Sequence, residues 1–388
     1  MDQLIVFGED WGRHPSSTQH LIQQLHHQFE VHWINSIGLR SPSFSQRDWH
    51  RLREKVKQAW HRQPRDGTVC HNSAPFNTIS PLVWPLAVHP LLKQLNSRLL
   101  QRHLPAKSGK RIIWASLPSA VDYLDDLNPD LVVYYCGDEF SALAGVDHQR
   151  VAEKEQQLIT RSDLIFCASQ ALLSKFPESK RHLLSHGVDL DLFSTPQTNP
   201  YSASDSRFKV GFYGSVNDWL DQKLLCHLAR SRPNIDFYLI GRHDSDVSLL
   251  AAEPNIILQP AVAHHALPQY VQHWDAAMLP FVDNQQIKAC NPLKLREYLA
   301  SGCPVISSDF PAAHAYPSHI SIAKTTSDWL EALDAFCHLN NQFRLQYKTT
   351  AQNLMINESW EQKALHTLSL INNRLKTKHA YLSGLCVN

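Results

Sequence analysis

Residues 291–307 read Asn291-Pro292-Leu293-Lys294-Leu295-Arg296-Glu297-Tyr298-Leu299-Ala300-Ser301-Gly302 and then Cys303-Pro304-Val305-Ile306-Ser307. The first part has a helical pattern and the second is an apolar strand pattern, a junction typical of α/β folds. Asn291 is a favoured N-cap residue, and the proline after it restrains it to extended backbone. Pro292 suits the first helical position, and Gly302 suits the end of a helix. The stretch therefore predicts a helix over 292–301 followed by a strand.

The entrance of this helix has the chemistry of an anion site. The amides of a first helical turn have no partner within the helix, and the helix dipole adds positive potential there. At the carboxyl edge of a parallel sheet such an entrance binds phosphate. Lys294 adds a full charge for a phosphate, and Glu297, one turn further on the same face, can accept both hydroxyls of a ribose. The spacing suits a nucleoside diphosphate. The alternative is a solvated Lys–Glu pair on an ordinary helix.

The rest of the chain alternates short apolar runs with amphipathic segments, which predicts βαβ units and mostly parallel sheets. The predicted strands are 3–7, 31–34, 111–116, 131–135, 163–167, 181–184, 208–213, 235–240, 255–258, 276–280, 304–307 and 319–323. The predicted helices are 148–160, 169–176, 218–230, 267–274, 292–301, 326–339 and 360–374. We therefore expect an α/β protein.

A chain of 388 residues is too long for one ordinary hydrophobic core, so two domains are expected. The clearest linker is the polar, proline-containing stretch 196–207, after which the α/β pattern restarts. We predict a first Rossmann-like domain over 1–195 and a second over 208–357. Residues 358–388 are predicted to form a C-terminal helix and tail.

The first domain contains a basic insertion over about residues 40–111. It carries 14 Lys and Arg against three Asp and Glu, whereas the whole chain is balanced at 37 against 36. The overall charge gives no sign of nucleic-acid binding. A local basic region suits the phosphates of an anionic membrane or of a pyrophosphate-linked acceptor. The alternative is a set of solvated helices whose basic side chains cover apolar surface.

Cysteine and histidine usage points away from metal sites. The eight cysteines are scattered without a Cys-x-x-Cys pair, which favours free thiols in a reducing compartment. The pairs His26-His27 and His264-His265 lack the i,i+4 spacing of a helical metal pair. The first apolar run is too short for a signal peptide, and the longest, 81–92, is too short to span a bilayer. We expect a cytoplasmic protein, peripheral on the inner face of the cytoplasmic membrane where the basic region contacts it.

Three further places at the predicted strand ends could carry chemistry. Gly214 and Ser215 follow the strand 208–213, where a glycine lets the backbone approach a phosphate. Arg242 follows the strand 235–240 and offers another cation. The alternative is an ordinary surface arginine, which would give the same sequence pattern. Asp138 follows the strand 131–135 and is a candidate base. The alternatives are that it caps the next helix or that Glu139 takes its place.

Taken together, these segments resemble GT-B-fold glycosyltransferases, in particular bacterial polysaccharide enzymes of the family-4 or teichuronic-acid type. The main likeness is the motif from Asn291 to Gly302 with Pro304-Val305-Ile306. Weaker likenesses follow in order along nearly the whole chain: Trp11 with 15–21, 96–102, 132–140, 161–165, 186–189 with Phe193, 210–214 with Trp219, 274–276 with 279–281, and Glu358-Ser359-Trp360.

The resemblance implies two Rossmann-like domains with parallel sheets facing a central cleft and a C-terminal helix that crosses back to the first domain. It implies transfer of a sugar from a nucleoside-diphosphate sugar to an acceptor hydroxyl, with a lipid-linked or polysaccharide intermediate as acceptor. Glu297 would hold the donor ribose, Lys294 and Gly214 the diphosphate, and Arg242 would line the same site. No permanently bound cofactor and no metal are expected.

Two rival functions share this fold. One is a nucleotide-sugar 2-epimerase, against which the basic insertion argues, since a soluble sugar nucleotide needs no membrane contact. The other is a non-catalytic partner that binds nucleotide sugar. Within the transferase reading, Ala289 stands where many retaining relatives have a glutamate, and their Arg and Lys clamp is not recognisable around Asn217 and Asp218. These departures favour an inverting reaction with Asp138 as general base.

Overall fold

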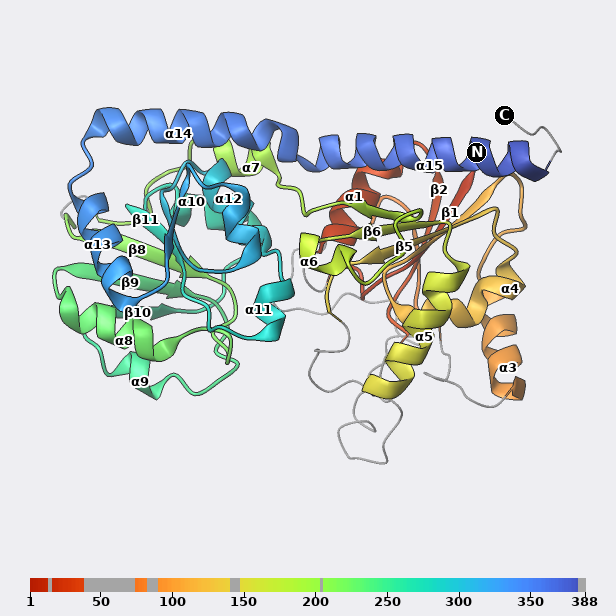
Figure 1. The fold of residues 1–388 in the computed structure, drawn as a ribbon, viewed down its shortest axis with the longest axis horizontal. Coiled ribbons are helices and arrows are strands. Elements are labelled where there is room, and N and C mark those ends of the chain that lie inside the picture. The colour runs from red at the N-terminus through yellow and green to blue at the C-terminus, as the bar shows by residue number, and fades with distance from the viewer. Residues whose placement is uncertain (13–15, 38–73, 82–89, 140–146, 203–204, 383–388) are drawn as a thin grey trace. The chain divides into compact units, whose positions relative to one another are not determined.

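Two parallel sheets organise the chain, each inside its own unit (Figure 1). One unit comprises Met1–Leu184 and Ala364–Asn388, and the other Ser185–Lys363. The computed structural model describes residues 1–382 apart from 13–15, 38–73, 82–89, 140–146 and 203–204. The two α/β units with parallel sheets that the sequence predicted are confirmed.

The first sheet has seven strands in the order β3-β2-β1-β4-β5-β6-β7, and every neighbouring pair is parallel. Its strands are β1 Gln3–Phe7, β2 Glu30–Ile34, β3 Asn77–Ile79, β4 Arg111–Ala115, β5 Leu131–Cys136, β6 Leu164–Cys167 and β7 Arg181–Leu183. The edge strand β3 was not predicted, because only one of its three residues is buried and it has no apolar run. The central strands β1, β4 and β5 are buried throughout, as strands covered on both faces must be.

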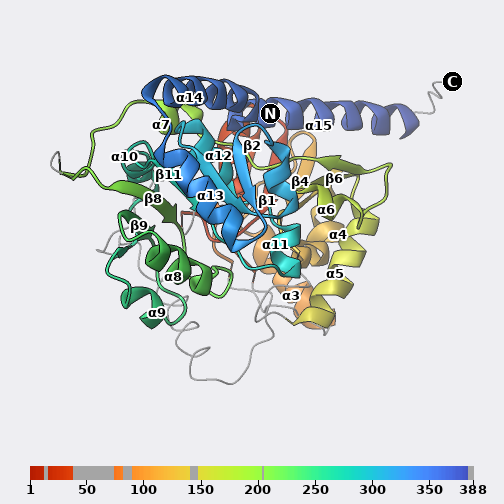
Figure 2. The same ribbon diagram turned by 60° about the vertical axis from the view of Figure 1, so that its left-hand side comes forward.

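The helices of the first unit lie on both sides of its sheet, with α4 and α5 on one side and α15 on the other (Figures 1 and 2). They are α1 Ser17–Leu25, α3 Pro90–Gln101, α4 Leu124–Leu127, α5 His148–Arg161 and α6 Gln170–Leu173, with a 3-10 helix over Pro118–Tyr123. Polar contacts tie neighbouring helices together. Ser97 Oγ of α3 donates to Asp126 Oδ2 of α4 at 2.5 Å, and Arg161 of α5 pairs with Asp125 of α4 at 2.6 Å.

The second sheet has six parallel strands in the order β10-β9-β8-β11-β12-β13. They are β8 Phe208–Tyr213, β9 Ile235–Ile240, β10 Ile256–Gln259, β11 Ala276–Leu279, β12 Val305–Ser308 and β13 Ile320–Ala323. The helices are α7 Leu190–Ser194, α8 Gln222–Ser231, α9 Ser248–Ala251, α10 Leu267–Val271, α11 Gln285–Ala289, α12 Leu293–Ala300, α13 Thr326–Cys337 and α14 Asn341–Met355. Helices α8, α9 and α13 pack together in one layer, and α7, α10, α12 and α14 in another (Figures 1 and 2).

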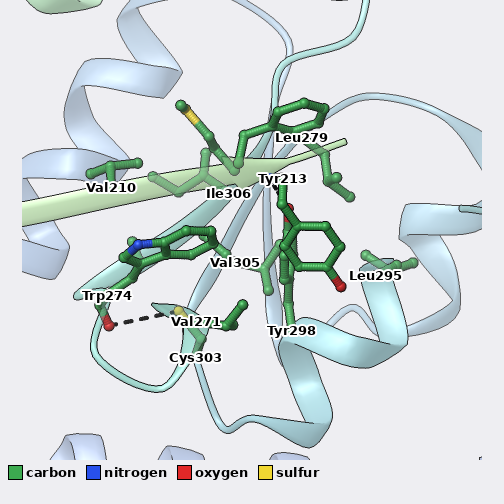
Figure 3. Close-up of a cluster of buried hydrophobic side chains, with 14 of the residues drawn as sticks. Val210, Tyr213, Val271, Trp274, Leu279, Leu295, Tyr298, Cys303, Val305 and Ile306 are labelled. Atoms are coloured by element: carbon green, nitrogen blue, oxygen red, sulfur yellow. Dashed lines mark hydrogen bonds between the residues drawn. The ribbon is translucent and has the colours of Figure 1, made fainter. Parts of the chain in front are cut away.

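Part of the core of the second unit lies between its sheet and helix α12. Tyr298 and Leu295 of α12 point toward strands β8 and β12 together with the indole of Trp274 (Figure 3). The indole Nε1 of Trp274 donates to the Tyr201 hydroxyl at 2.7 Å, and the fully buried Tyr298 hydroxyl accepts from Tyr213 N at 3.2 Å. This packing fixes the helix that carries Lys294 and Glu297.

The last helix, α15, runs over Trp360–Leu382 and is longer than the predicted 360–374. Its first residues belong to the second unit, and from Ala364 onward it belongs to the first. Near its end, Lys378 Nζ pairs with Asp163 Oδ2 at 2.8 Å, beside the start of β6. The helix that the resemblance led us to expect to cross back to the first domain is present.

Much of the basic insertion over 40–111 lies outside the described residues; the parts within them include β3 and α3. Among the helices that the structure describes, none is both long enough and apolar enough to cross a membrane. Six of the eight cysteines lie in the described ranges, all as free thiols, and four of them, 136, 167, 226 and 303, are buried.

Candidate functional site

The candidate site of the second unit lies where the chain leaves strands β8 and β11. These strands are neighbours, but β8 continues to β9 on one side and β11 to β12 on the other. Loops diverge at such a switch point and leave room for a ligand at the carboxyl edge of the sheet. Gly214 and Ser215 follow β8, and helix α12 lies in the connection after β11. The sequence therefore placed these segments at one end of the sheet correctly.

The glycines that end β8 and β9 allow two backbones to come unusually close. Gly214 N donates to Ile240 O at 2.8 Å, and a methyl group on Gly241 would lie 1.9 Å from Gly214 O. Gly214 itself has φ +132°, which side chains rarely adopt, and a methyl group there would lie 2.9 Å from Lys294 Cε and Nζ. The predicted pair of Gly214 and Lys294 is thus in contact.

Helix α12 begins differently from the prediction. The N-cap is Pro292 rather than Asn291, and no side-chain hydrogen bond caps the helix. The physical reason is that Asn291 Oδ1 accepts from the guanidinium of Arg296 at 2.8 Å, so this oxygen is turned toward the buried arginine. At the other end Gly302 has φ +73° and terminates the helix, as predicted.

Lys294 is half-buried at the helix entrance and lies against an aromatic ring. Its Nζ is 5.3 Å from the ring centroid of Phe212, a cation–π distance. Burial lowers the pKa of Lys294, although the negative charge of Glu297 acts in the opposite direction. A cation that is partly stripped of water binds an anion more strongly than a fully solvated lysine does.

Glu297 lies one turn further and is the most enclosed charge of the site, with 6% of the residue exposed. The Tyr213 hydroxyl donates to its Oε2, and His264 Nε2 donates to its Oε1 at 2.7 Å. Burial alone would raise the pKa of Glu297. The contacts with His264 and Tyr213 and the charge of Lys294 outweigh it and hold the pKa below its usual value. The carboxylate is therefore ionised and acts only as an acceptor.

His264 and Tyr213 both contact Glu297, and the sequence singled out neither as a site residue. His264 stands in a 3-10 turn, His264–Ala266, that follows β10. Burial would lower the pKa of His264, but the hydrogen bond and charge of Glu297 raise it above its usual value. The signal in the sequence was a histidine just past the end of a strand, where the carboxyl edge lies; we weighed it only as a metal ligand.

Ser215 and Arg242 follow the same edge without joining the Lys294–Glu297 pair through any contact that we observe. Ser215 is half-buried directly after Gly214. The side chain of Arg242 is 59% exposed, and its nearest charged partner is Asp244, with the two side chains 3.4 Å apart. In this structure Arg242 is therefore a surface arginine near the strand end.

A second ionic group fixes the opposite side of α12. Arg296 Nε donates to Glu358 Oε2 at 3.0 Å, and Lys363 pairs with the same oxygen at 2.9 Å. Val188 N donates to Glu358 O at 3.0 Å, which joins two segments that the family resemblance had singled out separately. Burial, and then the charges of Arg296 and Lys363, lower the pKa of His186 to about 3, so its ring is neutral. This group is part of the scaffold of the site.

In the first unit, Asp138 follows β5 and is exposed. The pKa of Asp138 is raised, first because nearby protein atoms displace water from its carboxyl group and then because of the negative charge of Glu9. Glu9 follows β1 at the same edge of the sheet, and its Oε1 accepts from Gln19 Nε2 at 3.2 Å. The alternative base, Glu139, pairs with Lys175 at 2.7 Å, which makes it less available for proton transfer than Asp138.

Within the described residues no group of three or more His, Cys, Asp or Glu side chains could hold a metal ion. The expected independence from metal stays a prediction.

The two parallel-sheet units, joined by a helix that starts in one and continues in the other, have the GT-B fold. The family described as glycosyl transferases group 1 matches residues 207–336, within the second unit. TuaH of Bacillus subtilis (strain 168), described as a putative teichuronic acid biosynthesis glycosyltransferase, is 28% identical over 239 residues. That match covers 56% of this chain and 60% of TuaH. The chain thus matches about three fifths of the length of this curated relative.

Solved structures of the same fold cover nearly the whole chain. Anabaena HepE in complex with UDP and glucose has a TM-score of 0.65 at 14% identity, covering 95% of this chain and 99% of HepE. Sucrose-phosphate synthase from Thermosynechococcus elongatus has a TM-score of 0.67 at 13% identity, covering 97% of this chain and 100% of the synthase. A glycosyltransferase from Rickettsia africae has a TM-score of 0.68 at 13% identity, covering 97% of this chain and 98% of that glycosyltransferase. Together the matches confirm the resemblance to GT-B-fold glycosyltransferases that the motifs indicated.

Proposed function

We propose that the chain is a glycosyltransferase that moves a sugar from a nucleoside-diphosphate sugar to an acceptor hydroxyl. The observation that carries the proposal is the pair on α12: half-buried Lys294 against Gly214, and ionised Glu297 one turn further. A cation beside a glycine backbone suits a diphosphate, and a fixed carboxylate suits the two hydroxyls of a ribose. The pair stands at the switch point of the sheet, where ligands of such folds bind.

The relatives support the class of donor and product. HepE has been solved with UDP and glucose, and TuaH is described as an enzyme of teichuronic acid biosynthesis. By likeness we propose a nucleotide sugar as donor and a lipid-linked or polysaccharide intermediate as acceptor, in the making of cell-envelope polysaccharide. Asn291, Gly214 and Ser215 would border the donor site, and Arg242 would reach the diphosphate only by turning away from Asp244.

We propose Asp138 as the general base that takes the proton of the acceptor hydroxyl. An inverting transfer needs such a base, and a raised pKa brings a carboxyl group closer to the pH at which it must accept a proton. Asp138 is exposed, whereas Glu139 is paired with Lys175.

A peripheral position on an anionic membrane is the second part of the proposal. In the described part of the basic region, α3 exposes Leu91 and Leu95, 68% and 52%, with Leu92 beside them. Arg98 and Arg102 are exposed further along the same stretch. Exposed leucines next to basic side chains suit the interface of a membrane that contains anionic lipid.

The test is a thermal-shift panel of UDP-, GDP-, ADP- and dTDP-sugars, followed by mass spectrometry of reactions with a lipid-linked acceptor. A transferase is stabilised by at least one sugar nucleotide and yields glycosylated acceptor. An epimerase instead changes the sugar nucleotide without an acceptor, and a non-catalytic partner gives stabilisation with no product. Absence of any stabilisation across the panel would overturn the proposal.

A further inference from the structure

Three segments that are far apart in the chain meet on the Glu297 carboxylate. Tyr213 comes from the end of β8, His264 from the turn after β10, and Glu297 from α12. We infer that His264 is a positioning residue for the donor: it holds the Glu297 carboxylate in the orientation that recognises ribose, and so sets the preference for ribonucleotides over 2′-deoxyribonucleotides. The inference rests on the proposed function of Glu297.

The hydrogen-bonding capacity of the carboxylate leads to this assignment. An ionised carboxylate has about four acceptor positions, two on each oxygen. Tyr213 occupies one on Oε2, and His264 occupies one on Oε1. One position on each oxygen is then left for the two neighbouring hydroxyls of a ribose. Because the two protein donors hold different oxygens, the carboxylate cannot rotate without breaking one of the bonds.

The histidine ring is itself held from two sides. Phe193 of α7 makes an edge contact with it, with ring centroids 5.4 Å apart and planes at 65°. The charges that face His264 are Glu297 and, from the N-cap of α7, Asp189. The groups around Glu297 are His264, Tyr213 and Lys294.

Loss of His264 should therefore act on the nucleotide through Glu297. Without the histidine a nearly enclosed carboxylate keeps Tyr213 and the charge of Lys294 but loses its hold on Oε1. Both acidic side chains near His264 favour its charged form, so the hold on Oε1 is charge-assisted at low pH and weaker at high pH. Ribose recognition should weaken accordingly when the ring loses its proton.

The test compares affinities for ribo- and deoxyribonucleotides by calorimetry. UDP, GDP and ADP are measured with the wild type first, and the tightest of them is then compared with its 2′-deoxy analogue. The ratio of the two dissociation constants is measured for wild type, His264→Gln, Glu297→Gln and the neighbouring control His265→Gln. Circular dichroism and thermal melting establish that each variant is folded.

We expect the wild type to prefer the ribonucleotide, and Glu297→Gln to lose this preference. His264→Gln keeps a neutral amide donor at about the same place but loses the positive charge. It should therefore reduce the preference by about five- to ten-fold, the difference between a charged and a neutral hydrogen bond. His265→Gln should behave as the wild type. The wild-type preference should fall as the pH rises from 6 to 9, whereas that of His264→Gln should stay constant.

The outcomes separate the two proposals. If Glu297→Gln keeps the wild-type preference, the donor role of Glu297 fails. If Glu297→Gln loses the preference while His264→Gln retains it in full at pH 6, the role of His264 is refuted. Should His264→Gln fail to fold, the wild-type titration decides, because a preference that stays constant from pH 6 to 9 also refutes it.

Discussion

The carboxyl edges of the two sheets both carry acidic side chains, but in opposite electrostatic settings. Glu297 in the second unit receives hydrogen bonds from Tyr213 and His264, and its pKa is lowered. Asp138 in the first unit is exposed, and desolvation and the like charge of Glu9 raise its pKa. An ionised, fixed carboxylate suits recognition of hydroxyl groups, whereas a carboxyl group with a raised pKa suits proton transfer. We therefore propose different roles for the two carboxyl groups, and the neighbouring residues account for the difference.

The largest effect is expected when the proposed base at the carboxyl edge of the first sheet is removed. Asp138→Asn should lower turnover by about 10²–10⁴-fold, the usual cost of losing a general base. Binding of the sugar nucleotide should stay unchanged, because this substitution alters none of the donor-side contacts of α12. Initial rates and calorimetric donor affinities measure the two effects. Asp125→Asn, which removes an exposed acid of the same unit that pairs with Arg161, is the control and should keep full turnover.

Turnover of Asp138→Asn close to that of wild type would exclude Asp138 as the base. So would a product that keeps the anomeric configuration of the donor, which NMR of the product would reveal.

Variants at the carboxyl edge of the second sheet should weaken binding of the sugar nucleotide instead. Glu297→Gln and Lys294→Ala each remove a charge-assisted contact worth about 1.5–3 kcal/mol, so the dissociation constant of the donor should rise tens-fold. Calorimetry with the sugar nucleotide measures this change. Lys288→Ala is a matched control, since Lys288 on α11 is exposed and pairs with Asp283. Donor affinity that is unchanged in both folded variants would contradict the assignment.

The sequence predicted the scaffold of both edges well, because buried parallel strands leave continuous apolar runs. Every predicted strand is present within a residue or two. Among the strands that the structure describes, the short, mostly exposed β3 was not predicted. Helix boundaries were less well predicted where caps decide them. Helix α8 begins at Gln222 instead of 218, because Asp221 caps it by accepting from Leu224 N at 2.9 Å.

The sequence predicted only those residues of the site that belong to a recognisable motif. Lys294, Glu297 and Gly302 lie in one motif, and their spacing fixes their relation. The cap of α12 was wrong because Arg296 turns out to be buried and binds the Asn291 side chain, a contact that spacing does not reveal. His264 was missed because its partner is 33 residues away in the chain, and only the fold brings the two together.

The units should also differ in affinity for membranes. If the first unit brings the enzyme to a lipid-linked acceptor, the protein should sediment with anionic but not with neutral vesicles. Each basic residue near the surface contributes about 1 kcal/mol, so binding should weaken in high salt. Leu91→Gln with Leu95→Gln, on α3, should reduce sedimentation. Leu345→Gln on α14, equally exposed in the second unit, should not. Equal binding to both kinds of vesicle, or none, would refute the membrane role.

The His264–Glu297 pair should have a smaller effect, on the pH dependence of the free energy of unfolding. The raised pKa of His264 contributes stability that is complete below about pH 6.5, its ordinary value, and is lost as the pH rises through the higher folded value. The lowered pKa of Glu297 contributes above about pH 4.3 and is lost as the pH falls through the lower folded value. The free energy of unfolding of the wild type should therefore exceed that of His264→Gln most between about pH 4.3 and 6.5, by an amount on the order of 1 kcal/mol. Urea unfolding from pH 5 to 9 measures it, and a difference that grows above pH 7 would contradict the ion pair.

The smallest expected effect is that of metal removal. A diphosphate needs its charge neutralised, and the second edge offers Lys294 and the uncapped first turn of α12 for this purpose. The acidic side chain beside them, Glu297, already accepts hydrogen bonds from Tyr213 and His264, and we assign its remaining acceptor positions to the ribose rather than to a metal ion. EDTA should therefore leave the rate of sugar transfer unchanged, and added magnesium or manganese should not raise it. Initial rates after dialysis against EDTA provide the measurement. Loss of activity that magnesium or manganese restores would show that the diphosphate is neutralised by a metal ion. Lys294→Ala would then be expected to raise the dissociation constant of the donor far less than proposed above.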